Sequence, residues 1–210
     1  MLVTSEVLWR AKLMRGEVAR KFVHISVGTF VAFWPYFMSW GQIVLMSAAF
    51  LVGILGSHYL SKYLPKNLQI FHAVHSVSRR TRGLIFFPVG IGLSALLSPE
   101  PIVFTAAILH LSLADGLAAV VGKRYGLMHQ YKVHNYTKTL AGTATFYLVS
   151  TIIVISVILF SGTPITWPVV PLLVWLPMAA TLIENLAVAG TDNIFVPLLI
   201  IIVLQATQVY

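Results

Sequence analysis

The sequence contains no cysteine and few charged residues. Of its 210 residues only 10% are charged, whereas 58% are hydrophobic. The absence of cysteine excludes disulfides, thiolate catalysis and metal sites with cysteine ligands. The scarcity of charge excludes a water-soluble domain, in which about a quarter of the residues are charged. The composition therefore predicts an integral membrane protein.

Basic residues are absent from most of the chain. All fourteen lysines and arginines lie in three stretches, 10–21, 62–82 and 123–138. The connections near residues 39, 98–101 and 161–166 carry no basic residue, and Glu100 is their only charge. Because short loops rich in lysine and arginine stay on the cytoplasmic side, the three stretches predict one cytoplasmic face and a cytoplasmic amino terminus.

The net charge of +8 does not indicate a nucleic-acid partner. The basic residues flank apolar runs instead of forming one stripe, so membrane orientation and anionic headgroups explain them better. The partner that this pattern indicates is the lipid bilayer, and we expect no nucleic acid. The oligomeric state stays open.

Apolar segments of suitable length occur about seven times. A spanning helix needs about 20 mainly apolar residues. The candidates are 22–38, 41–61, 83–97, 101–121, 140–160, 167–189 and 193–208. The segment 83–97 is short and contains Pro88, Gly90 and Gly92, which favours a broken or tilted span. We predict an all-α, polytopic transmembrane bundle that forms a single domain over residues 1–210, with a basic cytoplasmic segment at 1–21.

Three carboxylates lie where a membrane protein rarely places them. Asp115 and Glu184 fall within the cytoplasmic halves of predicted spans, and Asp192 lies in the turn between the last two. A charged group within a span costs about 2.5–3.5 kcal/mol on insertion scales. Each carboxylate could pair with a buried lysine or arginine, which would only fix the bundle. Three carboxylates on one face favour a functional site.

Two neighbouring patterns each allow two interpretations. The small residues around Asp115 favour either close helix packing or the approach of a ligand to the backbone. The stretch from Lys138 to Thr143 combines a cation, hydroxyls and small residues at a helix start, as a phosphate site does. Alternatively, Thr139 is a plain N-cap and Lys138 an interfacial anchor. The spacing from Gly116 to Arg124 departs from a P-loop and follows a membrane helix, so we reject that motif.

Several of these features together resemble a known family. They are Arg20 to His24 with Gly28 and Trp34-Pro35, Asp115-Gly116, Gly122, Gly126, Lys138 to Thr143, and Glu184 with Asp192-Asn193 and Pro197. In order and spacing they resemble the family of phytol kinases, dolichol kinases and CTP-dependent diacylglycerol kinases. The resemblance covers nearly the whole chain. It implies transfer of the terminal phosphate of CTP to the hydroxyl of a membrane lipid, with a divalent metal.

The resemblance and the residue chemistry together suggest roles for the candidate residues. Mg²⁺ would lie on Asp115 and Asp192, and Glu184 would orient or deprotonate the lipid hydroxyl. The nucleotide would be held by Arg20, Lys21, His24, Gly122, Lys123, Arg124, Lys138, Thr139, Gly142, Thr143 and Asn193. Many family members have two acidic residues where this chain has Thr191-Asp192, and often Ser where it has Thr143. The number of carboxylates that share the metal therefore stays open.

Two other functions fit a polytopic protein with buried carboxylates. A phosphatidate cytidylyltransferase would also use CTP and a metal, but its acidic signature near the carboxyl end is missing. A transporter commonly has buried carboxylates and a broken span, although here the polar residues gather at one face instead of the midplane. We expect a lipid kinase in the cytoplasmic membrane of a prokaryote. The sequence leaves the acceptor open among phytol, a shorter isoprenoid alcohol, a polyprenol and diacylglycerol.

Overall fold

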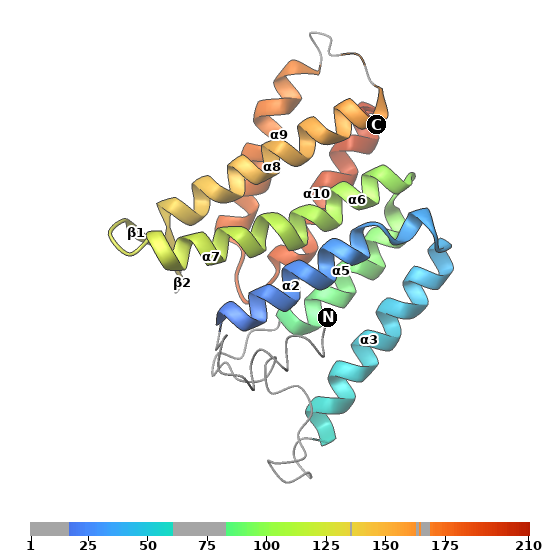
Figure 1. Cartoon of the computed structure of the whole chain (residues 1–210), viewed down its shortest axis with the longest axis horizontal. Helices are drawn as coiled ribbons and strands as arrows, with labels where there is room; N and C mark the ends of the chain where they lie inside the picture. Colours follow the sequence, from blue (N-terminus) through green and yellow to red (C-terminus); the bar gives the residue numbers. More distant parts are fainter. Residues whose placement is uncertain (1–16, 61–82, 135, 163, 165–168) are drawn as a thin grey trace.

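The computed structural model describes residues 17–60, 83–134, 136–162, 164 and 169–210 (Figure 1). Within these ranges the side chains of residues 17–20, including Arg20, and those of residues 58 and 60 lie outside the description. The basic stretch 62–82 and residues 1–16 of the predicted amino-terminal segment also lie outside the described residues.

The described part of the chain is mainly helical. Its helices are α2 (Glu17–Ala32), α3 (Trp40–Leu60), α5 (Gly83–Leu97), α6 (Pro101–Leu109), α7 (Asp115–Tyr125), α8 (Leu140–Ser161), α9 (Val170–Leu186) and α10 (Asp192–Thr207). A π-helical segment, His110–Ala114, joins α6 and α7 into one helix, Pro101–Tyr125. A short 3₁₀ turn, Trp34–Tyr36, follows α2. The predominance of helix agrees with the predicted bundle.

A small β-hairpin departs from the all-α prediction. Strands β1 (Gln130–Val133) and β2 (Tyr136–Thr139) pair antiparallel, with Tyr131 opposite Lys138. The strands contain tyrosine, valine and threonine, which favour extended backbone. The prediction missed the hairpin because each strand has only four residues, inside a segment whose basic residues indicated a simple loop.

Three helices are long and apolar enough to cross a membrane in the described part of the chain. They are Trp40–Ser57 within α3, Pro101–Tyr125 and Leu140–Ser161. The helices α5, α9 and α10 are apolar but shorter. Pro88 lies within α5 without breaking it, so of the two expected forms of this span, broken or tilted, the structure does not show the break. Gly90 lies against α10, where a Cβ atom would come within 2.0 Å of the Asn193 carbonyl oxygen. Gly90 thus permits close packing of two helices.

The helices surround one central element. In the most apolar 18 residues of Pro101–Tyr125, 72% of the residues are buried, whereas in Trp40–Ser57 of α3 only 11% are. One cluster of buried side chains joins α6 to α8, α9 and α10, and includes Phe146. A second cluster, which includes Phe104, joins α6 to α2, α3 and α5. Figure 1 accordingly shows α3 at the edge of the bundle.

Successive helices alternate in direction, and this brings polar helix ends together. The ends of α3, α7 and α9 meet the beginnings of α2, α5, α8 and α10 around one cavity. The hairpin adds Gln130 and residues 136–139 to the same cavity wall. Side chains that are up to about 170 positions apart in the sequence therefore share one end of the molecule.

Candidate active site

Half of the acidic residues of the chain converge at one place. The chain has six carboxylate side chains. Those of Asp115, Glu184 and Asp192 bring one oxygen atom each to within 4.8 Å of one another. Asp115 begins α7, Glu184 lies near the end of α9 and Asp192 begins α10. Only the folded bundle creates this cluster.

Cationic side chains accompany two of the carboxylates. The Lys21 ammonium, on α2, donates to Asp115 Oδ2 at 2.5 Å. The His24 Nε2 atom lies 3.3 Å from the same oxygen. On the other side, Lys138 Nζ lies 2.5 Å from Glu184 Oε1 and 3.0 Å from the Glu184 carbonyl oxygen. The pairing with lysines that the sequence allowed as an alternative is therefore present for Asp115 and Glu184, and it occurs inside the cluster.

The π-helical segment positions His24 beside Asp115. The Asp115 N–H bonds to the carbonyl oxygens of His110 and Ser112. The carbonyl oxygen of Leu111 instead accepts a hydrogen bond from His24 Nε2 at 2.8 Å. Because a carbonyl only accepts, His24 carries its proton on Nε2 in this arrangement. Single π-turns of this kind frequently occur at functional sites.

Lys138 remains a cation in spite of its partial burial. Burial by itself lowers the pKa of the Lys138 ammonium, but the adjacent Glu184 carboxylate more than offsets this effect. The pKa is therefore raised above its ordinary value. Lys138 is thus charged at neutral pH and can hold either a carboxylate or a phosphate.

The carboxylate cluster fits a divalent cation. Among the described residues, no lysine, arginine or histidine nitrogen lies within ion-pair distance of Asp192, although Asp115 and Glu184 have such partners. Within the described part of the chain, the Asp192 Oδ1 atom accepts from the backbone N–H and the side-chain amide of Asn193, at 3.1 and 3.5 Å. Among the side chains that the structure describes, three carboxylates thus stand beside two lysines and His24, and carboxylate oxygens are ligands that suit a hard ion such as Mg²⁺.

The beginning of α8 packs closely against α7. Thr139 is the N-cap of α8, since its Oγ1 atom accepts from the Gly142 N–H at 3.1 Å. A Cβ atom added to Gly122 would lie 2.7 Å from Thr139 Oγ1, and one added to Gly142 would lie 3.0 Å from the Ala118 carbonyl oxygen. Both glycines therefore allow the two helices to approach. This packing role is one of the two interpretations that the sequence allows for such small residues.

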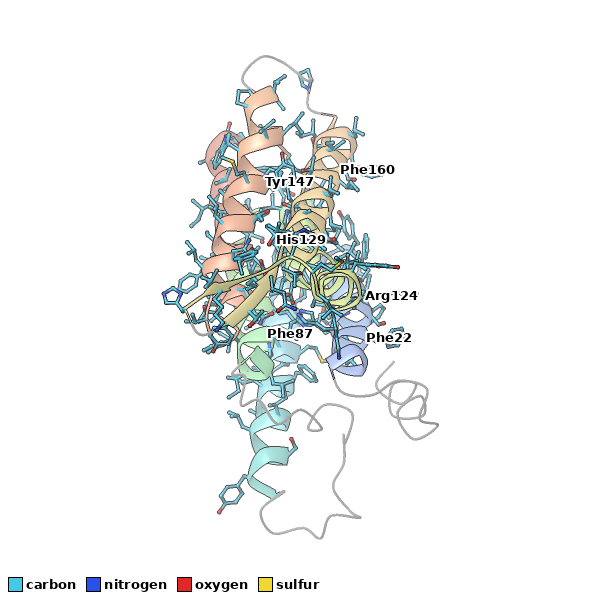
Figure 2. The ribbon with its side chains drawn as sticks, turned by 90° about the vertical axis from the view of Figure 1, so that its left-hand side faces the viewer. Phe22, Phe87, Arg124, His129, Tyr147 and Phe160 are labelled. Atoms are coloured by element: carbon cyan, nitrogen blue, oxygen red, sulfur yellow. The ribbon has the colours of Figure 1, made fainter. Side chains whose placement is uncertain are left out.

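Most of the predicted site residues line a single cavity of about 740 Å³. The three carboxylates do so, together with Lys21, His24, Gly122, Lys123, Lys138, Thr139, Gly142, Thr143 and Asn193. Arg124 does not line it, because its guanidinium lies over the ring of Tyr125, 5.4 Å from the centroid. Figure 2 shows Arg124 apart from Phe87, which is part of the cavity wall.

Two polar residues beside the cluster, Tyr131 and Asn185, were not among the predicted site residues, although Thr143, which both contact, was. The Tyr131 hydroxyl bonds to Asn185 Oδ1 and contacts Thr143 Oγ1, both at 2.5 Å. Thr143 also donates to Asn185 Oδ1 at 3.1 Å. The sequence does indicate Asn185 as a site candidate, because its polar amide directly follows Glu184 in an apolar span. No such signal marks Tyr131, because its position depends on the unexpected hairpin.

These features define a helical membrane protein with a charge-rich site at one end of its helices. A phytol kinase from Synechocystis sp. is 31% identical to this chain over 205 residues, which cover 94% of this chain and 82% of that protein. The chain therefore belongs to the phytol kinase family, which confirms the resemblance drawn from its motifs. No family model matches the sequence, and no solved structure matches it significantly.

Proposed function

We propose that this protein is a lipid-alcohol kinase that transfers the terminal phosphate of CTP to the hydroxyl of an isoprenoid alcohol such as phytol. The phytol kinase relative supports this class of acceptor, because phytol is a long-chain isoprenoid alcohol. The choice of CTP as donor rests on the resemblance between motifs. The observation that carries the proposal is the cluster of three carboxylates and two lysines inside one cavity.

Phosphoryl transfer requires mainly positioning and positive charge around the transferred group. In the proposed reaction, the lipid hydroxyl oxygen forms a bond to the terminal phosphorus of CTP, and the bond from that phosphorus to the bridging oxygen breaks. CDP leaves, and the hydroxyl proton passes to the Glu184 carboxylate. Glu184 is placed for this role because it lines the cavity beside Lys138, whose charge would attract the phosphate.

Asp115 and Asp192 would hold a divalent cation such as Mg²⁺. When bound, such an ion neutralises negative charge on the phosphates and so stabilises the transition state. The protein's own contribution is to keep both carboxylates fixed. Asp115 is held by Lys21 and His24, and Asp192 by the amide groups of Asn193.

The remaining cavity residues would bind the triphosphate and nucleoside. Lys123, in the last turn of α7, and Lys138, in β2, supply positive charge, and α8 begins directly after Lys138 with Thr139 as its N-cap and Gly142 in its first turn. Thr139 already bonds to Gly142, so we assign this helix start a weaker phosphate contact than Lys138. We assign Arg20 to the same role on its position one residue before Lys21, whereas Arg124 would reach the nucleotide only by leaving the ring of Tyr125.

We also propose that the chain crosses the cytoplasmic membrane of a prokaryote seven times, with the amino terminus and the carboxylate cluster on the cytoplasmic side. The alternating helix directions support this topology, as does the location of all basic residues in three stretches. Cytoplasmic nucleotide would then reach the cavity directly, while the lipid alcohol would arrive from the bilayer.

Isotope transfer tests the activity. Purified protein in detergent, with Mg²⁺ and phytol, is expected to move label from the terminal phosphate of CTP into lipid. Label from the α-phosphate should stay in the aqueous phase. Lipid labelled from the α-phosphate would instead indicate a cytidylyltransferase. No labelled lipid from CTP, ATP, GTP or UTP with any acceptor of an alcohol panel would contradict the kinase proposal.

A further inference from the structure

The cavity has two chemically different parts. At one end lie the carboxylates with Lys21 and Lys138, and at the other lie mainly apolar side chains of α2, α3 and α5. The part contributed by α3 consists of Ala49, Phe50, Gly53, Ile54 and Ser57. Their spacing places them on one face of the helix. The adjoining wall includes Val27 from α2 and Phe87 from α5.

The apolar part adjoins the surface of the bundle that faces lipid. Helix α3 packs mainly on α5, where Gly92 lies against Ser47 in the first third of α3. Further along, the α3 face from Ala49 to Ser57 lines the cavity, while Val52 and Leu55 are exposed on other faces. Within the described part of the chain, α3 therefore separates the exposed face with Val52 and Leu55 from this apolar part of the cavity.

We propose that this apolar part, between α2, α3 and α5, binds the hydrocarbon tail of the acceptor lipid alcohol. The inference rests on the proposed function, which places the hydroxyl of that lipid at Glu184. An amphiphile with one polar end and a long apolar chain matches a cavity with the same division, since each part of the ligand meets surface of its own polarity. The nucleotide, which is polar throughout, fits only the opposite part near Lys123 and Lys138.

Gly53 provides the space that the tail would occupy. Among the described residues, no heavy atom lies within 4 Å of a Cβ atom built at Gly53, although Gly53 lines the cavity. A phenylalanine there would fill space in the apolar part without a clash against those residues. Gly56 offers a matched control on the same helix, because it is equally open but does not line the cavity.

Such a substitution should change the selectivity of the enzyme for the chain length of the lipid alcohol. We expect Gly53→Phe to lower kcat/KM for phytol by about tenfold or more, a range that the discrimination of a few methylene groups reaches. For a five-carbon isoprenoid alcohol, which does not extend to α3, kcat/KM should stay within about threefold. Gly56→Phe should leave the values for both alcohols unchanged.

Three results would overturn the proposal. They are an equal loss with both alcohols in Gly53→Phe, no loss with either, or the same loss in Gly56→Phe. A binding experiment without nucleotide separates this inference from the kinase activity. A phytol analogue with a photoreactive diazirine at its chain end should label residues of α3 or α5 in the parent protein and lose that labelling in Gly53→Phe. If the parent transfers no phosphate, the proposed function fails, and the photolabelling alone decides the tail site.

Discussion

Asp115 contacts Lys21 and His24 of α2 and lies beside two further carboxylates. Lys21 and Asp115 are both buried, so their ion pair is held away from bulk water. Removing one partner of a buried pair costs more than the pair itself contributes, because the remaining charge is left uncompensated. Residue-scale experiments at this position must therefore separate stability from activity.

The substitution Asp115→Asn should lower phosphoryl transfer by roughly 100-fold or more, since it removes a charge that acts on the reacting phosphate. It should also destabilise the protein, by about 3 kcal/mol, because the Lys21 ammonium loses its partner. Adding Lys21→Met should restore thermal stability in detergent but not activity. Glu100→Gln, at the opposite helix ends, serves as the control. An Asp115→Asn protein that keeps full activity would contradict the site assignment.

At the scale of elements, the β-hairpin connects α8, α9 and the segment before α10 around the carboxylates. Lys138 of β2 reaches Glu184 of α9, and Tyr131 of β1 bonds to Asn185 of α9 and Thr143 of α8. The Tyr136 hydroxyl accepts from the Ala189 N–H at 3.1 Å, which fixes the hairpin to the segment before α10. We therefore interpret Tyr131 as a positioning residue that keeps Lys138 and Glu184 aligned.

The substitution Tyr131→Phe tests this interpretation. The substitution removes the hydroxyl and with it the hydrogen bonds to Asn185 and Thr143, each of which contributes about 1 kcal/mol. Their loss should misalign the hairpin and lower kcat by roughly fivefold or more. The KM for the lipid alcohol should hardly change, because Tyr131 lies outside the apolar part of the cavity. Tyr125→Phe, on an exposed side chain, is the matched control. A purely structural role would instead lower the melting temperature and leave kcat of the folded protein unchanged.

At the scale of the whole molecule, the alternating helices gather all described cavity residues at one end of the bundle. The same end contains the basic stretch 123–138, whereas the connections at the other end contain Glu100 and no basic residue. This asymmetry predicts that nucleotide has access from one side of the membrane only.

Cysteine labelling measures that topology without interference, since the chain has no cysteine of its own. A thiol reagent that cannot cross membranes should label His129→Cys only in inside-out vesicles and Gly162→Cys only in right-side-out vesicles. Both positions are exposed. The unsubstituted protein should give no signal. Labelling of both positions from the same side would contradict the seven-span topology.

Composition and local pattern determined several properties without any three-dimensional information. Long apolar runs predicted helices, because a membrane-spanning segment must satisfy its own backbone hydrogen bonds. The cost of burying Asp115 and Glu184 identified them as site candidates. Motif order gave the family, which the phytol kinase relative confirms.

Only the tertiary structure decided which of these residues meet. The pairing of Lys21 with Asp115 and of Lys138 with Glu184 joins residues 94 and 46 positions apart, and no local pattern encodes such distances. The hairpin, the Tyr131 network and the separation of Arg124 from the cavity likewise depend on how α7, α8 and α9 pack. The physical reason is that propensity and hydropathy act between near neighbours along the chain, whereas a site is made by helices that come together only when the bundle folds.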